Sequence, residues 1–186
     1  MMRSRKSEGD ARARLVEAAG RSFRVGGFGG TGVDGLAKQA GLTSGAFYAH
    51  FDSKAEAFRL AVAEGLTFLR NGILSFQERH GRNWREPFID FYLGPRMEVA
   101  LDEACGLPSF SFDVARADET TRLLYEAELE QLVEAVAAGL RGAHARERAL
   151  SLLAILSGAA AMARAVKNDE LRRQILGAAN NAAKAV

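Results

Sequence analysis

The sequence predicts an all-α protein of about nine helices, and three observations support this fold class. Apolar residues recur at intervals of three and four along most of the 186 residues, as they do on the buried face of a helix. No segment shows the convincing two-residue alternation of a half-buried strand. Prolines, which interrupt helices, occur only at Pro87, Pro95 and Pro108.

The first helix is expected from Asp10, with an apolar face formed by Leu15, Ala18, Ala19 and Phe23. Gly26-Gly27 should end it, because glycine readily adopts the left-handed conformation at a helix C-terminus. Thr31-Gly32-Val33-Asp34 then indicates a capping box, in which the Thr31 hydroxyl covers an orphan N–H and Asp34 reaches back.

That capping box opens a short second helix, whose inward positions are Val33, Leu36, Ala37 and Ala40. Gly41-Leu42 ends this helix, and a third short helix starts at Thr43-Ser44 and includes Phe47. Ser53 and Glu56 form a second capping box, which starts a long helix to about Arg79, ended by Gly81. Further helices are expected near residues 84–103, 109–116, 118–142, 145–166 and 169–184.

Composition narrows the class of protein. The chain is 48% hydrophobic and 26% charged, which is ordinary for a globular protein and too apolar for a disordered one. A single cysteine, Cys105, excludes an internal disulfide and a cysteine-rich zinc site. The basic start lacks the apolar run of a signal peptide, and the longest uncharged run, residues 149–163, is short and weakly hydrophobic for a membrane span. We therefore expect a cytoplasmic protein with no membrane segment.

Residues 33–51 have the layout of a helix-turn-helix, a motif whose second helix lies in the DNA major groove. Two short helices are joined by a tight turn that contains Gly41. Charge agrees with this interpretation, although it is a weak indicator by itself. Residues 1–60 hold ten Lys and Arg against six Asp and Glu, whereas the rest of the chain is slightly acidic.

Motifs in this part of the chain resemble the TetR family of bacterial repressors. They are Gly26 to Thr31, Leu36-Ala37, Ala40-Gly41-Leu42, Gly45 to Tyr48, His50-Phe51 and Ser53-Lys54. The resemblance covers about residues 11–62, and beyond residue 62 it is one of architecture. It implies a DNA-binding domain over residues 1–52, with a helix-turn-helix at about 33–51, and a helical effector-binding and dimerisation domain over residues 53–186.

The resemblance also implies particular DNA contacts. Tyr48 and His50 match positions that contact phosphates and neighbouring bases, and Lys54 matches a phosphate-binding lysine at a helix N-terminus. Thr31 is similar to a residue that both caps a helix and touches phosphate. The start of the recognition helix, which reads bases, corresponds to Thr43, Ser44 and Gly45. Arg3, Arg5 and Lys6 could form a basic arm along the DNA backbone or in the minor groove, or belong to a disordered tail.

Structural roles are open for some of these side chains. Tyr48 and Phe51 stand at helical spacing and could both belong to the core, and His50 could be an ordinary surface histidine. Gly32 departs from the family, which more often has Ser or Thr there. Thr43 and Ser44 are poor readers of base edges, so specificity is expected to depend partly on DNA shape.

Large apolar residues are dense between residues 66 and 125, which fits either a plain core or an apolar ligand pocket. The resemblance implies a pocket beneath the long helix for a small hydrophobic effector, whose binding shifts that helix and separates the recognition helices. The candidate lining residues are Phe68, Phe76, Phe88, Phe91, Tyr92, Phe110, Phe112 and Tyr125.

Cys105 lies in an expected turn between helices. It is either a buried inert thiol or a sensor of electrophiles. A sensor would need a lowered pKa, which Arg96, Arg116 or a helix N-terminus at Ser109 could supply.

The last two expected helices are rich in small residues, such as Ser157 to Ala161. We expect a second copy of the same pair to cover their apolar face, as in the family. The result is a two-fold homodimer with a four-helix interface formed by about residues 146–166 and 169–184. Its two recognition helices would bind the half-sites of a palindrome in double-stranded DNA.

The expected function is a sequence-specific transcriptional repressor that a small hydrophobic ligand releases from its operator. Alternatives are an activator, a ligand-independent DNA binder, or an electrophile sensor acting through Cys105. A helical enzyme is the alternative of another class, but His50, His80 and His144 are scattered and the glycine-rich segment 26–30 follows a helix rather than a strand. No catalytic residue, metal or cofactor is implied.

Overall fold

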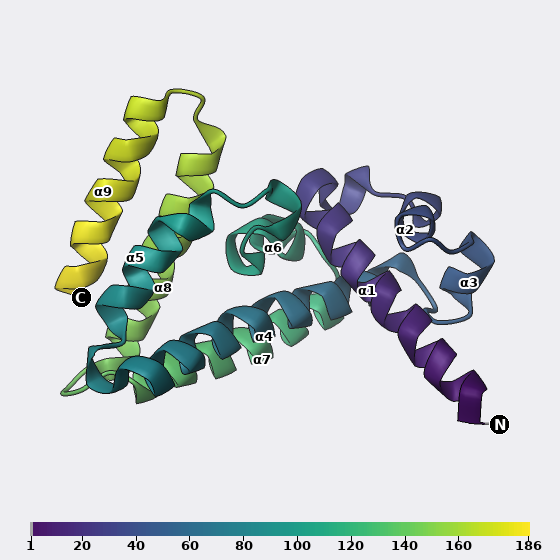
Figure 1. Ribbon diagram of the computed structural model, residues 1–186, viewed down its shortest axis with the longest axis horizontal. Helices are drawn as coiled ribbons and strands as arrows, with labels where there is room; N and C mark the ends of the chain where they lie inside the picture. The colour runs from purple at the N-terminus through teal and green to yellow at the C-terminus, as the bar shows by residue number, and fades with distance from the viewer. Residues whose placement is uncertain (1) are drawn as a thin grey trace.

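The computed structural model describes residues 2–186, with side chains described from residue 9 onward, and confirms the all-α class (Figure 1). The α-helices of this part are α1 (Met2–Gly30), α2 (Val33–Gln39), α3 (Ser44–Tyr48), α4 (Lys54–His80), α5 (Arg85–Leu93), α6 (Gly106–Ala115), α7 (Glu119–Ala138), α8 (Ala145–Ala165) and α9 (Asp169–Ala185). Three short 3₁₀ turns are η1 (Gly81–Asn83), η2 (Pro95–Met97) and η3 (Leu101–Glu103). The side chains of Arg3, Arg5 and Lys6, proposed as a basic arm, lie outside the described residues.

The molecule is elongated, with α1 to α3 at one end and α5, α8 and α9 at the other (Figure 1). The long helix α4 runs between the two ends with α7 alongside it, and α6 lies between them. Helices α4 and α6 therefore contact elements at both ends of the molecule.

Two apolar cores correspond to the two ends. The N-terminal core joins α1, α2, α3, the first half of α4 and α6, and its largest fully buried side chains include Phe23, Phe47, Phe58 and Phe110. The C-terminal core lies among α4, α5, α7 and α8 and contains Trp84, whose indole N–H donates to the Gly139 carbonyl at 2.9 Å. Because α4 and α6 contribute to the N-terminal core, that core extends beyond the helix-turn-helix.

The predicted end of the first helix at Gly26-Gly27 appears as a kink within α1. Gly27 has φ 65° and ψ 176°, and one further helical turn continues to Gly30. A left-handed φ of this kind suits glycine, because other L-residues bring Cβ close to the following carbonyl.

The predicted capping box at Thr31 is wrong. Gly32 is the N-cap of α2 and receives no side-chain cap, while the buried Thr31 hydroxyl donates back to the Gly27 carbonyl at 3.0 Å. The extra turn of α1 places the Gly27 carbonyl next to the Thr31 hydroxyl, so this hydroxyl does not cap α2.

The second capping box is confirmed at the Ser53 cap, while its return bond reaches the residue before Ser53. The Ser53 hydroxyl accepts from the Glu56 N–H at 3.2 Å, and the Glu56 carboxylate accepts from the Asp52 N–H at 2.8 Å. The helix that follows runs to His80 and ends at Gly81, which has φ 54°.

The continuous helix expected over residues 84–103 is wrong. Helix α5 ends at Leu93 because Pro95 lacks an N–H and disfavours the helical conformation at the preceding residue, where Gly94 has φ −111° and ψ −108°. The next helix begins at Gly106, three residues before the expected start, since Pro108 is tolerated in a first turn.

By length and composition, helix α8 could cross a membrane. It instead packs within the bundle, against α7 and α9, with Leu152 and Leu156 buried. An apolar helix of this kind is an ordinary element of a helical core.

Candidate nucleic-acid interface and adjoining cavity

Helices α2 and α3 form the predicted helix-turn-helix. Gly41 in the turn has φ 68°, and the Leu42 N–H donates to the Ala37 carbonyl at 2.8 Å. Leu36 and Phe47 are fully buried between the two helices and α1, which fixes their relative orientation.

The turn is held by a residue that sequence reasoning missed. Arg14 of α1 donates to the Ala40 carbonyl, and a Cβ added at Gly41 would lie 2.8 Å from the Arg14 guanidinium. This contact joins positions 26 residues apart, so no local motif indicates it.

Among the candidate DNA contacts, Tyr48 is the large side chain that α3 presents to solvent. It is 61% exposed, with its ring edge against buried Phe47. Thr43 and Gly45 are also exposed, while Ser44 and His50 are half-buried. Phe51, which could have been core or contact, is core at 2% exposure.

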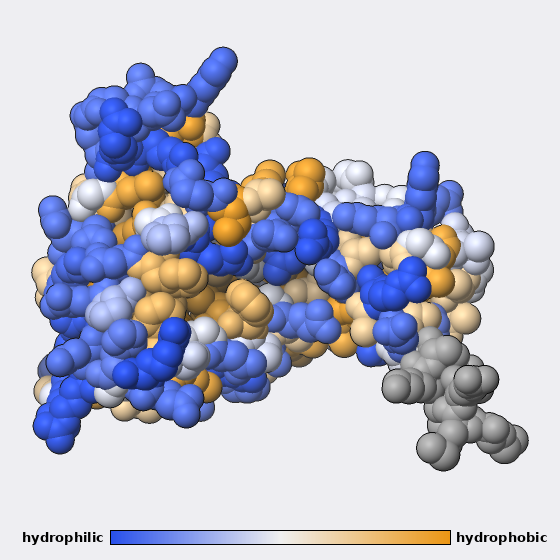
Figure 2. All heavy atoms as spheres, viewed as in Figure 1, coloured by the Kyte–Doolittle hydropathy of each residue, from blue (hydrophilic) through white to orange (hydrophobic). Residues whose placement is uncertain are grey.

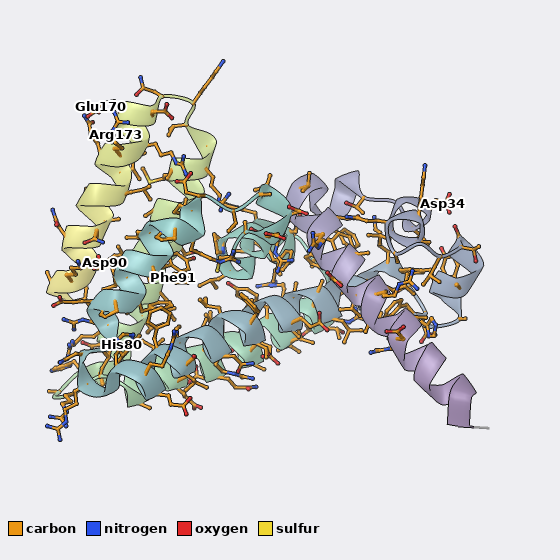
Figure 3. The ribbon with its side chains drawn as sticks, viewed as in Figure 1. Asp34, His80, Asp90, Phe91, Glu170 and Arg173 are labelled. Atoms are coloured by element: carbon orange, nitrogen blue, oxygen red, sulfur yellow. The ribbon has the colours of Figure 1, made fainter. Side chains whose placement is uncertain are left out.

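The two hydroxyls at the start of α3 already have partners. Thr43 Oγ1 caps the helix by accepting from the Ala46 N–H at 3.2 Å. Ser44 Oγ donates to the Asp34 carboxylate on α2, which faces α3 (Figure 3). These bonds fix the start of α3 and leave both hydroxyls less available to bases.

Lys54, at the first turn of α4, also has partners within the chain. Its ammonium donates to the carbonyls of Phe28 at 2.9 Å and Thr31 at 3.1 Å, and it lies 4.2 Å from the centre of the Phe28 ring. An ammonium has three donors, so one remains beyond these two bonds. Lys54 therefore ties the end of α1 to the start of α4.

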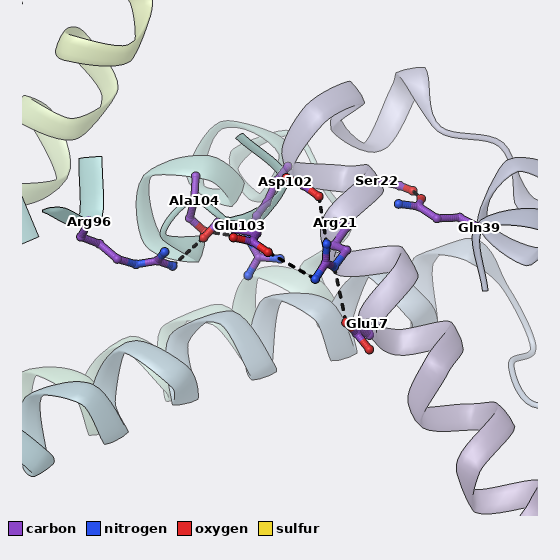
Figure 4. A network of polar contacts seen from close by, with 9 residues as sticks. Glu17, Arg21, Ser22, Gln39, Arg96, Asp102, Glu103 and Ala104 are labelled. Carbon is purple, nitrogen blue, oxygen red and sulfur yellow. Dashed lines mark hydrogen bonds and ion pairs between the residues drawn. The ribbon is translucent and has the colours of Figure 1, made fainter. Parts of the chain in front are cut away.

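Helix α1 is also tied to the middle of the molecule. Arg24 Nε donates to the Ala104 carbonyl at 2.8 Å, and Arg21 pairs with Asp102 at 3.1 Å (Figure 4). Past the kink, the Phe28 N–H donates to the Asp113 carboxylate of α6 at 2.9 Å. The position of η3 and α6 thus sets the position of α1.

A cavity of about 270 Å³ lies beside these ties. Its walls come from α1, α5, the η2–η3 segment, α6 and α8. The lining residues are Arg24, Tyr92, Arg96, Met97, Leu101, Ala104, Cys105, Pro108, Ser109, Ala160, Ala161, Arg164 and Ala165.

A narrower cavity of about 50 Å³ adjoins it beneath α4. Residues shared by both cavities are Arg24, Tyr92, Arg96, Ala104 and Cys105. Figure 2 shows apolar side chains gathered around a hollow between α4, α5 and α6, where Phe91 of α5 points in Figure 3.

Five of the eight candidate ligand-binding residues line the narrower cavity: Phe68, Phe76, Phe88, Phe91 and Tyr92. The other three lie elsewhere. Phe110 is fully buried in the N-terminal core against Phe58, and Phe112 is 72% exposed. The Tyr125 hydroxyl hydrogen-bonds the Ser111 hydroxyl at 2.9 Å, between the two cores.

Cys105 is the N-cap residue of α6, in the predicted turn, and lines both cavities. Burial raises the pKa of its thiol and outweighs the nearby Tyr92 hydroxyl and the charges of Arg96 and Arg24, which lower it. Of the other groups that could have activated it, Arg116 pairs with Asp113 instead. A raised pKa disfavours the thiolate that an electrophile sensor needs.

Sequence reasoning missed most of the larger cavity, including Arg24, Arg164 and the wall residues Leu101 and Ala160. These residues come from segments far apart in the chain. Arg96 was singled out only as a neighbour of Cys105, and no periodic or local pattern joins the others.

At the far end, α8 and α9 lie side by side (Figure 1). Asp90 of α5 pairs with Lys184 at 2.6 Å and accepts from Asn180 at 2.8 Å, which holds α9 in place. Exposed apolar side chains on the pair include Leu150, Met162 and Leu171.

Comparisons with known proteins agree with this architecture. Residues 15–61 match the family model described as bacterial regulatory proteins, tetR family. A segment of 73 residues is 34% identical to the HTH-type transcriptional regulator LmrA of Bacillus subtilis, and it spans 39% of this chain and 39% of LmrA.

Solved structures match over nearly the whole chain. A TetR-family regulator from Cytophaga hutchinsonii has a TM-score of 0.80 at 14% identity, covering 97% of this chain and 96% of that one. The regulator FadR of Bacillus subtilis, in complex with stearoyl-CoA, has a TM-score of 0.70 at 11% identity, covering 92% and 95%. Residues 15–61 therefore match the DNA-binding domain of the tetR family, and the chain as a whole has the fold of solved TetR-family regulators.

Proposed function

We propose that the protein is a repressor that binds a palindromic operator as a homodimer and leaves it when a small apolar ligand fills the cavity. One observation carries this proposal. The segment that lines the cavity, η3 to the first turn of α6, is bonded to α1 of the DNA-binding end through Ala104 and Asp102, and the far end of α6 is bonded to it through Asp113.

The DNA contacts follow from exposure and partners. Gly45 and Tyr48 contact DNA from α3, His50 does so from the turn that follows, and Lys54 uses its remaining donor on a phosphate. The hydroxyls of Thr43 and Ser44 are already hydrogen-bonded within the chain, which supports readout through DNA shape. Thr31 is buried, with its hydroxyl on a carbonyl, and its role is to close α1.

Release follows from the ties described above. A ligand that pushes on Ala104 or Leu101 moves η3 and α6, and with them Arg24 and Phe28 of α1. Glycines at the crossing of α4 and α6 support this route, because a Cβ at Gly106 would lie 2.9 Å from the Gly65 Cα. The two helices are close enough there for α6 to displace α4, which separates the recognition helices of a dimer.

The chain divides its tasks between two regions. Residues 1–52 bind DNA, residues 53–186 bind the ligand, and the homodimer forms through about residues 146–166 and 169–184. The stearoyl-CoA complex of FadR supports an effector with an apolar chain for this fold. A regulator of this kind acts in the cytoplasm, where its DNA lies.

A mobility-shift titration tests the function. The probe is the gene's own upstream intergenic region, at physiological salt, with excess competitor DNA. We expect a shifted band that resists competitor. Binding that competitor removes entirely would contradict a local operator, and selection from random DNA would then show whether any operator exists.

A further inference from the structure

The Tyr92 hydroxyl lacks a hydrogen-bond partner among the described residues, although Tyr92 is only 3% exposed. The Cys105 thiol lies close enough to interact with it, but a thiol is only a weak acceptor. A buried hydroxyl left unpaired lowers stability, so native structures rarely retain one without a use. Tyr92 lines both cavities, so a ligand there can reach its side chain.

Three arginines line the same cavity, and their hydrogen bonds go only to backbone carbonyls. Arg24 donates to Ala104, Arg96 to Glu103, and Arg164 to Val99 at 3.1 Å. Within the described residues, none of the three is within ion-pair distance of a carboxylate.

Neighbouring arginines outside the cavity show the contrast. Arg21 pairs with Asp102, and Arg172 pairs with Glu98 at 2.9 Å. Within the described residues, the arginines of the cavity are therefore attracted by carboxylates such as Asp102 only at longer range, without a direct ion pair.

Desolvation acts on the same groups. Burial lowers the pKa of Arg24 and of Arg164, and the like charge of Arg96 lowers both further. An anion placed among these guanidinium groups would relieve both effects.

The rest of the wall is apolar, through Met97, Leu101, Pro108, Ala160 and Ala165. A ligand for this cavity needs an anionic head and an apolar body. At roughly 30 Å³ for each water, a volume of about 270 Å³ corresponds to about nine waters, or a ligand of about ten non-hydrogen atoms.

We propose that the effector is a small organic carboxylate with an apolar tail. Its carboxylate binds the guanidinium groups of Arg96 and Arg164 and accepts a hydrogen bond from the Tyr92 hydroxyl. Guanidinium groups suit this role because their paired N–H donors match the two carboxylate oxygens. This inference rests on the proposed function, since it names the ligand of the same cavity.

Calorimetric binding of octanoate to the full chain tests the inference without DNA. Octanoate has about the required size, and 1-octanol has a matched tail without the charge. We expect octanoate to bind at least tenfold more tightly than 1-octanol. Equal affinities for octanoate and 1-octanol would overturn the proposal that the ligand has an anionic head and would indicate a purely apolar site. Absence of octanoate binding would overturn the proposal that the ligand is a carboxylate with an apolar tail.

Variants locate the site. Arg96→Gln should weaken octanoate binding at least tenfold with little effect on 1-octanol, and Arg122→Gln, at an exposed site on α7, is the matched control. Tyr92→Phe removes an unpartnered hydroxyl, so the variant should fold normally and bind octanoate severalfold more weakly. Unchanged octanoate affinity in both cavity variants would overturn the site.

A mobility shift with octanoate separates this inference from the proposed function. Release of operator DNA by octanoate supports both. Octanoate that binds through Arg96 and Tyr92 without releasing DNA would support the ligand site and contradict the release mechanism.

Discussion

At the residue scale, Tyr48 combines high exposure with a fixed position, because its ring packs against buried Phe47. Tyr48→Ala should weaken operator binding roughly tenfold, the size of a lost hydrogen bond to a charged group, without lowering the melting temperature. Fluorescence anisotropy with labelled operator measures the affinity. Phe112→Ala, at the 72% exposed Phe112 of α6, is the control and should bind normally. Normal binding by Tyr48→Ala would remove Tyr48 from the interface.

Lys54 has both a structural and an electrostatic role. Lys54→Ala should lower the free energy of unfolding by about 1–2 kcal/mol, because two charge-assisted bonds to Phe28 and Thr31 are lost. It should also reduce the salt dependence of DNA binding by about one phosphate contact. Urea denaturation and a salt titration measure the two effects. Lys38→Ala, at an exposed lysine of α2, should leave stability unchanged, and equal stability of the two variants would refute the tie.

Individual residues also show which features of the structure could be predicted from the sequence. The Ser53 cap and the Gly41 turn were predictable because each depends on neighbours within a few positions. The role of Thr31 was not, because its hydroxyl meets a carbonyl exposed only by the extra turn of α1 beyond Gly27. The cavity could not be predicted from the sequence for a similar reason, since Arg24 and Arg164 come together only through tertiary packing.

At the element scale, the kink of α1 is the feature that brings the Phe28 N–H to Asp113 of α6. Gly27→Ala should lower the free energy of unfolding by about 1–2 kcal/mol, because φ is 65° and the added Cβ would lie 3.0 Å from the Asp113 carboxylate. Gly29→Ala, where a Cβ meets nothing within 4 Å, is the matched control and should be neutral or stabilising. Urea denaturation of the pair measures the difference. Equal losses in the free energy of unfolding of Gly27→Ala and Gly29→Ala would show that the kink has no special requirement for glycine.

Element boundaries were predictable where a local signal marked them. Gly81 and the Ser53–Glu56 box gave the bounds of α4 closely, whereas the helix expected over residues 84–103 overran Gly94-Pro95. Apolar periodicity continues across that break because the η2 and η3 turns still bury residues such as Met97. The break matters for function, since the η2–η3 segment lines the cavity.

At the scale of the whole molecule, the account requires a dimer through α8 and α9. Met162 is 58% exposed on α8, so Met162→Glu should leave the fold intact and raise the dimer dissociation constant at least tenfold by burying a charge. Light scattering at micromolar concentration measures the mass. Leu123→Glu, at an equally exposed position on α7, should remain dimeric. A wild-type protein that is monomeric at this concentration would contradict the assembly.

Hydroxyl-radical footprinting on the upstream region tests most directly whether α3 reads an operator as half of a two-fold pair. We expect two protected half-sites related by a dyad, with centres about 34–36 Å apart or a multiple of it, and much weaker protection of both by Tyr48→Ala at a protein concentration near the wild-type dissociation constant. Protection without a dyad, or equal protection by Tyr48→Ala and the wild-type protein at that concentration, would contradict an operator read by α3 as half of a two-fold pair.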